Sequence, residues 1–379
     1  MRIGIVAGEP SGDFLGAQLI GALRRRLPGL EFVGIGGPKM QSAGMESWYP
    51  MERLAVRGYA EVLRHYAGLV SMRSRLKSQL LDARPSLFIG VDAPDFNLSL
   101  EAGLKRRGIP TIHYVSPSLW AWRGGRIRRM AAAVDHVLAL FPFEEQLYRR
   151  AGIAATYVGH PLADAIEPGD WTAWGREQLR LNAGGKTFAL LPGSRLSELK
   201  FHAEIFVKTA LRIAKRMPDA RFLVPLVSRE TRMLFESAQY EAQATDLKIT
   251  LLFGHAREAI AAADAVLVAS GTATLETALY RKPMVITYRM SPSSWSLISR
   301  MRYQPWVGLP NIIAGRFLVP EILQEQASPE NLAQALLNVC LDPEIQRRLP
   351  EQFAAMHELL RRNASERAAD AAMPWLQAN

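Results

Sequence analysis

The sequence predicts an α/β protein built from two doubly wound parallel sheets. Short apolar segments rich in β-branched residues alternate along the chain with longer amphipathic stretches, which is the pattern of repeated βαβ units. These apolar segments fall into two sets, and the stretch 165–175 between them contains the Pro-Gly pair and capping residues of an interdomain connection. Two such domains facing each other place the carboxyl ends of both sheets around one cleft, where open α/β sheets bind ligands.

The expected strands follow one another in order along the chain. In the first set they lie at residues 3–7, 32–35, 87–91, 111–115, 134–140 and 156–158. In the second set they lie at residues 187–191, 221–226, 249–253, 265–269 and 284–288. The segment from about 328 to 376 has helical patterns, with starts at Ser328-Pro329 and Asp342-Pro343. We therefore expect domains at 1–166 and 167–341, and C-terminal helices at 342–379 that pack toward the first domain or a partner subunit.

The composition limits the class of protein. A hydrophobic content of 49% and a charged content of 22% are those of a globular protein, and no apolar run is long enough to span a membrane. The chain begins with the strand-like Arg2–Ala7 and lacks an export signal, so we expect it in the cytoplasm. The single cysteine, Cys340, excludes an internal disulfide and lies in an apolar pattern typical of a core. The histidines near strand ends lack metal-ligand spacing, and we expect neither a metal nor a cofactor.

The formal net charge of +10 indicates an acidic partner. The segment 105–130 contains seven basic residues and no acidic one, but no nucleic-acid-binding motif accompanies it. An anionic membrane surface or a phosphorylated substrate therefore fits better than nucleic acid. The helical stripe between Tyr59 and Val70 is apolar on one face, which suits either a buried core helix or a helix that docks on a membrane.

Two glycine turns in the second domain predict a nucleotide site. Ser270, Gly271 and Thr272 follow the expected strand 265–269 and begin a helix, whose first amides and dipole attract anions. Glu276, one turn into that helix, is suited to accept hydrogen bonds from a ribose. The alternative is an ordinary strand-to-helix connection with a capping residue and a glutamate that complements the dipole.

The second glycine turn strengthens the nucleotide interpretation. Gly193, Ser194 and Arg195 follow the expected strand 187–191, and Arg195 adds a fixed positive charge for a phosphate. Two such turns in one sheet favour a nucleoside diphosphate over a coincidence of two structural caps.

In the first domain, two carboxylates emerge at the end of the expected strand 87–91. Asp92 ends the strand and has no evident structural task, whereas Asp95 follows Pro94 and suits a helix cap. Ser11, Gly12 and Asp13 lie in the first strand-to-helix turn, where they either meet a substrate or cap the following helix. That turn lacks both the dinucleotide fingerprint and the ATP-binding loop pattern.

An aromatic segment follows the expected strand 111–115. Ser116, Trp120, Trp122 and Arg123 combine rings with a fixed charge near a proline turn, so they are suited to stack a sugar or to lie at a membrane surface. An aromatic core next to a solvated basic helix explains the same residues equally well.

Taken together, these motifs resemble bacterial lipid-A-disaccharide synthases. The resemblance covers essentially the whole chain and is carried by residues 6–13, 92–97, 113–123, 191–195, 270–276 and 309–311. It implies a GT-B glycosyltransferase with two Rossmann-like domains facing a cleft. The implied donor is UDP-2,3-diacylglucosamine, the acceptor is 2,3-diacylglucosamine 1-phosphate, and the products are the β-1′,6-linked disaccharide 1-phosphate and UDP. The implied enzyme is inverting, independent of metal, and peripheral on the cytoplasmic face of the inner membrane.

The expected roles of the residues follow from both lines of argument. Asp92 is the candidate general base and Arg195 the residue that stabilises the diphosphate. The expected nucleotide-binding residues are Gly193, Ser194, Arg195, Ser270, Gly271, Thr272, Glu276 and, from the resemblance, Asn311. The expected substrate-binding residues are Ser11, Gly12, Asp13, Ser116, Trp120, Trp122 and Arg123.

Two other function classes stay open at this point. One is another enzyme that uses UDP-N-acetylglucosamine, such as an epimerase or a muramyl transferase. The other is a non-catalytic basic protein that binds a membrane or nucleic acid. No nucleic acid is expected as a partner, and a homodimer is left open.

Overall fold

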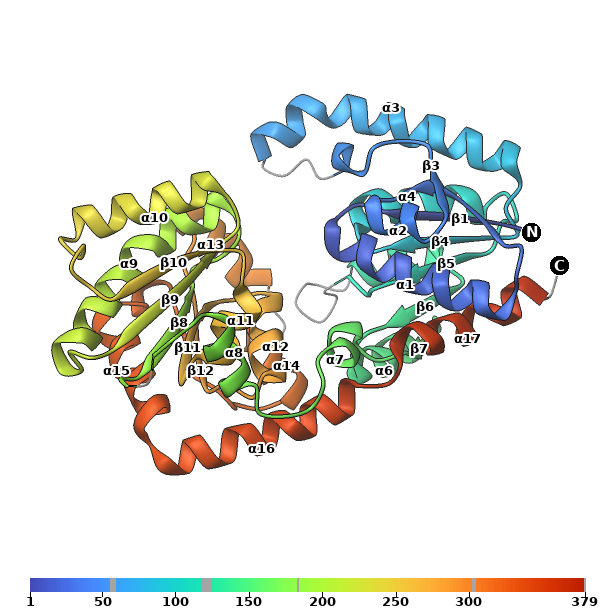
Figure 1. The fold of residues 1–379 in the computed structure, drawn as a ribbon. Helices are drawn as coiled ribbons and strands as arrows, with labels where there is room; N and C mark the ends of the chain where they lie inside the picture. Colours follow the sequence, from blue (N-terminus) through green and yellow to red (C-terminus); the bar gives the residue numbers. More distant parts are fainter. Residues whose placement is uncertain (55–58, 118–124, 183, 302–304, 378–379) are drawn as a thin grey trace. The chain divides into compact units, whose positions relative to one another are not determined.

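The computed structural model describes residues 1–54, 59–117, 125–182, 184–301 and 305–377 (Figure 1). The chain forms two compact units. Unit 1 contains Met1–Asp164 together with Leu360–Asn379, and unit 2 contains Ala165–Leu359. The C-terminal segment is therefore divided between the units, where the sequence predicted a separate helical region.

The described part of unit 1 contains a seven-stranded sheet in the order β3-β2-β1-β4-β5-β6-β7. All neighbouring strands are parallel, and the direction of winding reverses between β1 and β4. This reversal makes the sheet doubly wound, with its ligand-binding edge at the carboxyl ends of the strands. The strands are β1 (Arg2–Ala7), β2 (Glu31–Ile35), β3 (Met45–Ser47), β4 (Leu87–Val91), β5 (Thr111–Tyr114), β6 (His136–Ala139) and β7 (Ala154–Tyr157).

In unit 2, the described residues form a six-stranded sheet in the order β10-β9-β8-β11-β12-β13. Every pair is again parallel, and the winding reverses between β8 and β11. The strands are β8 (Thr187–Leu191), β9 (Arg221–Leu226), β10 (Ile249–Phe253), β11 (Ala265–Ala269), β12 (Met284–Tyr288) and β13 (Glu321–Leu323).

Helices connect the strands and cover the sheets (Figure 1). Those up to residue 165 are α1 (Pro10–Arg26), α2 (Pro38–Ser42), α3 (Tyr59–Ala83), α4 (Pro94–Lys105), α5 (Gly125–Ala133), α6 (Pro142–Arg150) and α7 (Pro161–Ala165), with the 3-10 turn η1 (Met51–Arg53). Those after it are α8 (Thr172–Gln178), α9 (Leu196–Arg216), α10 (Arg229–Glu241), α11 (Ala256–Ala262), α12 (Thr272–Leu279), α13 (Pro292–Met301), α14 (Leu309–Ala314), η2 (Gln324–Gln326), α15 (Pro329–Leu341), α16 (Pro343–Leu360) and α17 (Ala364–Gln377). Several start with proline, whose missing N–H costs nothing in the first turn.

The predicted strands are confirmed, and two further strands were missed. Both β3 and β13 are three residues long and lie at sheet edges, so they are too short to produce an alternating or continuous apolar pattern. Central strands such as β4 and β11 are buried along their whole length, as expected for a parallel sheet covered on both faces. Cys340 is buried in the core of unit 2, as predicted.

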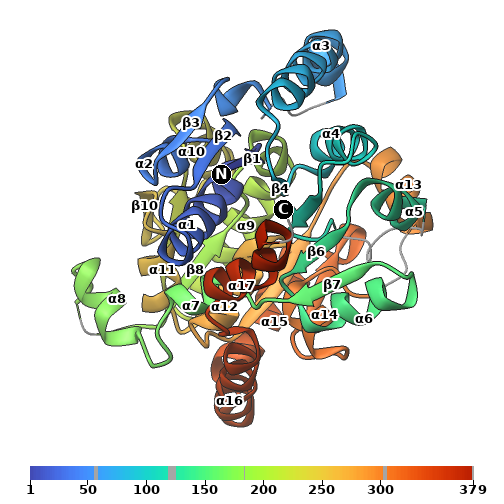
Figure 2. The ribbon, with the colours of Figure 1, turned by 90° about the vertical axis from the view of Figure 1, so that its right-hand side faces the viewer.

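Helix α17 returns to unit 1 and packs on α1 (Figure 2). Arg26 contacts Asp370 at 2.6 Å, and both Arg25 and Arg26 bond to the carboxylate of Glu366. The prediction that C-terminal helices pack back toward the first domain is thus confirmed for α17. Within the described chain, no helix is long and apolar enough to cross a membrane.

Candidate active site

Two glycine turns lie next to each other at the carboxyl edge of the unit 2 sheet. They follow β8 and β11, which are neighbouring strands with Leu191 paired to Val268. The reversal of winding falls between these same strands, and this is the position where doubly wound sheets bind ligands. The sheet therefore brings together the two turns that the sequence singled out separately.

The turn after β8 presents a cation. Gly193 has φ +118°, and a Cβ added there would lie 2.6 Å from Glu198 Oε2, so only glycine fits. The same Oε2 accepts hydrogen bonds from the backbone N–H groups of Ser194 at 3.0 Å and Arg195 at 3.3 Å. The side chain of Arg195 is 55% exposed, with its nearest oxygen in Glu198 at 3.8 Å. Because Glu198 already engages the two amides, the groups of this turn left exposed are the side chains of Ser194 and Arg195, of which Arg195 carries a charge suited to a phosphate.

The turn after β11 leaves backbone accessible. Gly271 has φ +148°, and a Cβ added there would meet nothing within 4 Å. Gly271 immediately precedes α12, so the first amides of that helix and its dipole are directed at this open space. Ser270 Oγ donates to the carbonyl oxygen of Val307 at 2.9 Å, and Thr274 Oγ1 donates to that of Gly271 at 2.7 Å. These bonds hold the turn and leave room for an anion in front of it.

Glu276 lies one turn further along α12. Its side chain is 19% exposed, and its Oε1 is 3.3 Å from Nε of Arg257 on α11. Burial raises the pKa of Glu276 above its ordinary value, although the charge of Arg257 opposes this. A half-buried carboxylate next to an anion-binding turn is a suitable acceptor for ribose hydroxyls. The sequence analysis did not identify Arg257.

Asn311 is buried, and its amide is fully used within unit 2. Its Nδ2 donates to the carbonyl of Val319 and to Glu321 Oε1, both at 2.9 Å, while its Oδ1 accepts from the backbone of Leu318 and Val319. Glu321 in turn accepts from the amides of Val307 and Gly308. In this structure Asn311 holds the loop that carries Val307 and so supports Ser270 indirectly. Its predicted contact with a nucleotide stays a prediction.

In unit 1, Asp92 lies in a strained turn at the end of β4. Asp92 and Ala93 both have left-handed backbones, with φ of +53° and +45°. Such conformations are costly for residues with a Cβ and gather at functional sites. The buried Asn97 stabilises this turn, because its Nδ2 donates to the carbonyl of Asp92 at 2.8 Å. Asp92 is half-buried, whereas its competitor Asp95 is exposed in the first turn of α4.

A buried ion pair lies beneath the Asp92 turn. His113 Nδ1 on β5 is 2.7 Å from Glu101 Oε1 on α4, and neither side chain is exposed. Burial by itself would lower the pKa of His113. The charges of Glu101 and Asp92 and the hydrogen bond to Glu101 outweigh this effect, so the pKa lies above its ordinary value. A Cβ on Gly90 would lie 2.1 Å from Glu101, so a glycine opposite His113 in the sheet makes room for the pair.

Several polar atoms around this pair lack partners within the described chain. They are Asn97 Oδ1, Glu101 Oε2 and His113 Nε2. Buried polar groups are normally bonded, and each unsatisfied one costs about 1–3 kcal/mol. Their concentration under the Asp92 turn distinguishes it from an ordinary helix start. Neither Asn97 nor Glu101 was predicted from the sequence to lie near Asp92.

The remaining predicted substrate residues are mostly structural in this state or outside the described residues. Asp13 is buried and accepts hydrogen bonds from the backbone N–H groups of Lys39 and Met40, so it caps α2. Gly12 packs against Ala7 and the carbonyl of Val91, and Ser11 is exposed in the first turn of α1.

The aromatic segment is described only in part. Ser116 is buried and its Oγ lies 2.7 Å from the hydroxyl of Tyr148, whose pKa burial raises. Trp120, Trp122 and Arg123 lie outside the described residues. In the stripe from Tyr59 to Val70, the side chains up to residue 67 also lie outside the described part. Among the described side chains, no group of three or more His, Cys, Asp or Glu could hold a metal ion.

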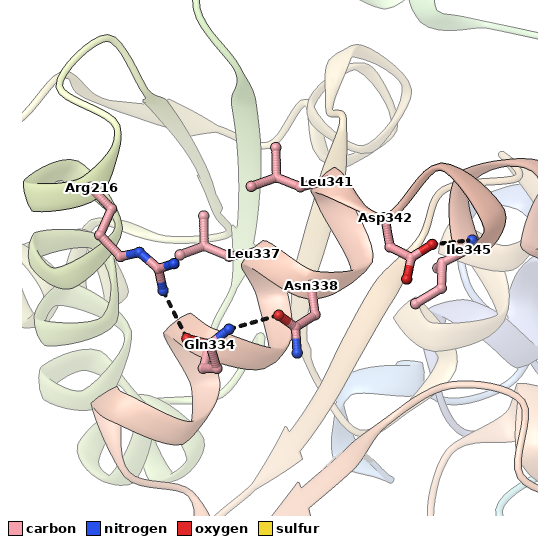
Figure 3. Close-up of a pocket in the computed structure, with 7 residues that line it drawn as sticks. All are labelled: Arg216, Gln334, Leu337, Asn338, Leu341, Asp342 and Ile345. Atoms are coloured by element: carbon pink, nitrogen blue, oxygen red, sulfur yellow. Dashed lines mark hydrogen bonds between the residues drawn. The ribbon is translucent and has the colours of Figure 1, made fainter.

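A separate hollow of about 500 Å³ lies in unit 2 between the ends of α9 and α15 (Figure 3). At one side Arg216 donates to Gln334 at 2.7 Å, and the lining includes the apolar side chains of Leu337 and Ile345. Both α9 and α15 run away from the carboxyl edge of the sheet, so this hollow lies at the opposite edge. It contains no residue predicted for the site.

Comparison with known proteins assigns the family. A sequence model described as lipid-A-disaccharide synthetase matches residues 3–372. The chain belongs to the lipid-A-disaccharide synthase family. It is therefore a glycosyltransferase of lipid A biosynthesis, and the resemblance noted in the sequence is confirmed.

Relatives with this name match along their whole length. The lipid-A-disaccharide synthase of Methylobacillus flagellatus is 54% identical over 375 residues, covering 99% of both chains. That of Dechloromonas aromatica is 55% identical over 377 residues, again with 99% of both chains covered.

Solved structures confirm the fold class. The UDP-GlcNAc 2-epimerase of Neisseria meningitidis, bound to UDP-GlcNAc, matches with a TM-score of 0.68 and 12% identity, covering 99% of this chain and all of the epimerase. The calicheamicin glycosyltransferase matches with a TM-score of 0.61 and 14% identity, over 100% of this chain and 98% of its own. At such low identity the likeness concerns the fold alone, which is the GT-B type with two Rossmann-like domains.

Proposed function

We propose that the protein transfers a diacylglucosaminyl group from UDP-2,3-diacylglucosamine to the 6-hydroxyl of 2,3-diacylglucosamine 1-phosphate. The products are the β-1′,6-linked disaccharide 1-phosphate and UDP. Membership of the family over nearly the whole chain supports this reaction. The observation that carries the donor half is the pair of adjacent glycine turns, one with an exposed Arg195 and one opening onto the start of α12.

The proposed donor site lies at the carboxyl edge of the unit 2 sheet. Arg195 and the first amides of α12 would bind the diphosphate, and Glu276 would accept hydrogen bonds from the ribose. As the glycosidic bond breaks, negative charge develops on the leaving UDP. A fixed guanidinium and oriented amides stabilise such charge without reorganising, so this reaction would proceed without a divalent ion.

The proposed acceptor site lies at the carboxyl edge of the unit 1 sheet. Asp92 would take the proton from the acceptor hydroxyl while that oxygen attacks the anomeric carbon of the donor. Attack from the face opposite the leaving UDP inverts the configuration at that carbon. A base must lie within hydrogen-bond reach of the proton it removes, and the clamped turn after β4 holds Asp92 in one place for this task.

We further propose that the protein acts at the cytoplasmic face of the inner membrane, because both substrates carry acyl chains. Unit 1 contains 24 of the basic and 16 of the acidic side chains, and so accounts for +8 of the total charge of +10. A positive surface attracts anionic lipid and an acceptor phosphate. A homodimer is compatible with this arrangement.

Release of UDP from matched donors tests the reaction. The expected result is release from UDP-2,3-diacylglucosamine only when the acylated acceptor phosphate is present, and none from UDP-N-acetylglucosamine. Equal turnover of the non-acylated donor would point to an epimerase-like or muramyl-transferase-like enzyme instead. No UDP release under any condition would contradict a transferase.

A further inference from the structure

A buried histidine, His202, links two turns at the proposed donor site. It lies in the second turn of α9, the helix that begins directly after Arg195, and its side chain is fully buried. Its Nδ1 is 2.8 Å from the carbonyl oxygen of Pro192, and its Nε2 is 2.9 Å from the backbone N of Arg289. The sequence analysis overlooked it, because nothing in the local pattern separates it from an ordinary helical residue.

The two partners determine the state of the ring. A carbonyl oxygen only accepts a hydrogen bond and a backbone N–H only donates one. The proton must therefore be on Nδ1 and the lone pair on Nε2, which makes the imidazole neutral. Burial lowers the pKa of His202, in agreement with this state, although the bond to Pro192 opposes the shift.

The ring joins parts of the site that the sheet keeps apart. Pro192 follows β8 and Arg289 follows β12, and β11 lies between these strands. The turn that follows β11 is also bonded to the end of β12, because the backbone N–H of Ser270 donates to the carbonyl oxygen of Thr287 at 3.0 Å. His202 also packs edge-on against Tyr288, with ring centroids 5.2 Å apart.

We propose that His202 is a positioning residue for the diphosphate end of the donor site. Its neutral ring fixes the turn Pro192–Arg195 against the end of β12, and this places the Arg195 guanidinium relative to the start of α12. The proposal rests on the proposed function only in assigning the diphosphate to these turns. No part of it requires His202 to touch the substrate.

Two substitutions separate the hydrogen bonds from the packing. His202→Phe keeps an aromatic ring beside Tyr288 and Phe206 but removes both bonds. His202→Asn places an amide near the Nδ1 position, where it can still donate to Pro192 but is too short to reach Arg289. A matched control is Phe206→Leu, which alters the side chain beside His202 on the same buried face of α9 and leaves both hydrogen bonds of the histidine in place.

The measurement is UDP affinity by calorimetry, together with the KM for each substrate. We expect His202→Phe to weaken UDP binding and raise the donor KM by on the order of tenfold, the range for losing a bond that leaves a buried partner unsatisfied. His202→Asn should fall between His202→Phe and the unchanged protein, and the acceptor KM should stay constant. Phe206→Leu should lower the Tm without changing UDP affinity.

Failure of this inference is distinguishable from failure of the donor site itself. If the unchanged protein does not bind UDP, the proposed donor site is wrong. If it binds UDP and Arg195→Ala weakens binding, but folded His202→Phe binds as tightly as the unchanged protein, the positioning role is wrong. Should His202→Phe not fold, unaltered UDP affinity of folded His202→Asn would overturn the proposal equally, because that variant lacks the bond to Arg289.

Discussion

The two units end their central strands in opposite ways. In unit 2, the turns after β8 and β11 use Gly193 and Gly271 at positive φ. In unit 1, the turn after β4 uses Asp92 and Ala93 at positive φ, although both carry a Cβ. Glycine adopts this conformation without steric cost, whereas a residue with a side chain does not.

The proposed roles of the two sites would account for this difference. A diphosphate is bound closely by backbone and by a cation, so the ideal turn has no side chain in the way. A general base is itself a side chain, so a glycine cannot provide it. If Asp92 is the base, as proposed, the strained turn is the cost of presenting it, and the hydrogen bond from Asn97 to the carbonyl of Asp92 offsets part of that cost.

His202 of unit 2 and His113 of unit 1 are both buried, but their hydrogen-bond partners and the shifts of their pKa values differ. His202 of unit 2 is held neutral between a carbonyl and an N–H group, and its pKa is lowered. His113 of unit 1 is paired with Glu101, and its pKa is raised. His202 joins the turn after β8 to the end of β12, whereas His113 senses the charge of Asp92 as well as that of Glu101.

The largest expected effect tests the role of the strained turn. We expect Asp92→Asn to lower turnover by about 10²–10⁴-fold, the usual contribution of a positioned base, and to leave UDP affinity unchanged. The matched control is Asp95→Asn, an exposed carboxylate three residues away on the same turn of chain, which should stay near normal. Stable, folded Asp92→Asn with normal turnover would show that another residue is the base.

A smaller effect tests the nucleotide side. Glu276→Ala should weaken UDP binding by about 1–3 kcal/mol, the range for hydrogen bonds to a charged group. The proton transfer proposed for Asp92 should not be affected. Calorimetry on the folded variant measures this directly. Unchanged affinity would remove Glu276 from the ribose site.

The pH dependence of UDP binding sharpens the same prediction. Because burial raises the pKa of Glu276, its carboxylate gains a proton at a higher pH than an ordinary glutamate as the solution is acidified. UDP affinity should therefore begin to fall above the usual glutamate range in the unchanged protein. In Glu276→Gln this part of the pH profile should be flat, and a persistent inflection would assign it to another group.

The uneven charge of the units predicts which one faces lipid. Replacing Arg128 and Arg129 of α5 with glutamine should weaken flotation with anionic vesicles, since each basic residue near such a surface contributes about 1 kcal/mol. The same change at Arg229 and Arg232 of α10 removes equal charge from unit 2 and should have less effect. Binding should also fall as salt rises. Equal losses from both pairs, or equal binding to neutral vesicles, would contradict docking through unit 1.

The smallest expected effect concerns the strain itself. Ala93→Gly removes the Cβ from a left-handed residue, and relief of strain should outweigh the added chain entropy by roughly 0.5–1 kcal/mol. The Tm should rise slightly while turnover is retained, because Asp92 keeps its side chain. A lower Tm would mean that the Ala93 methyl contributes more through packing than its conformation costs.

All strands except the two short edge strands, the two glycine turns and the family could be predicted from the sequence. Each of these is written in a few neighbouring residues, because a buried parallel strand is a continuous apolar run and the residues directly after it form the ligand edge. Asp92, Arg195 and Glu276 became candidates in this way, from their position after a strand or within the next helix. The short edge strands β3 and β13 were missed because three residues produce no pattern.

The contacts of those residues could not be predicted in this way. Asp13 was expected either to meet a substrate or to cap the following helix, α1, but its carboxylate caps α2, which starts 25 residues later at Pro38. Asn97 and His202 became visible only through bonds to turns on other elements. The physical reason is that a hydrogen bond to a backbone group leaves no trace in composition or periodicity, since every residue offers the same N–H and C=O groups. Which of these groups a side chain meets depends on the packing of helices on the sheet.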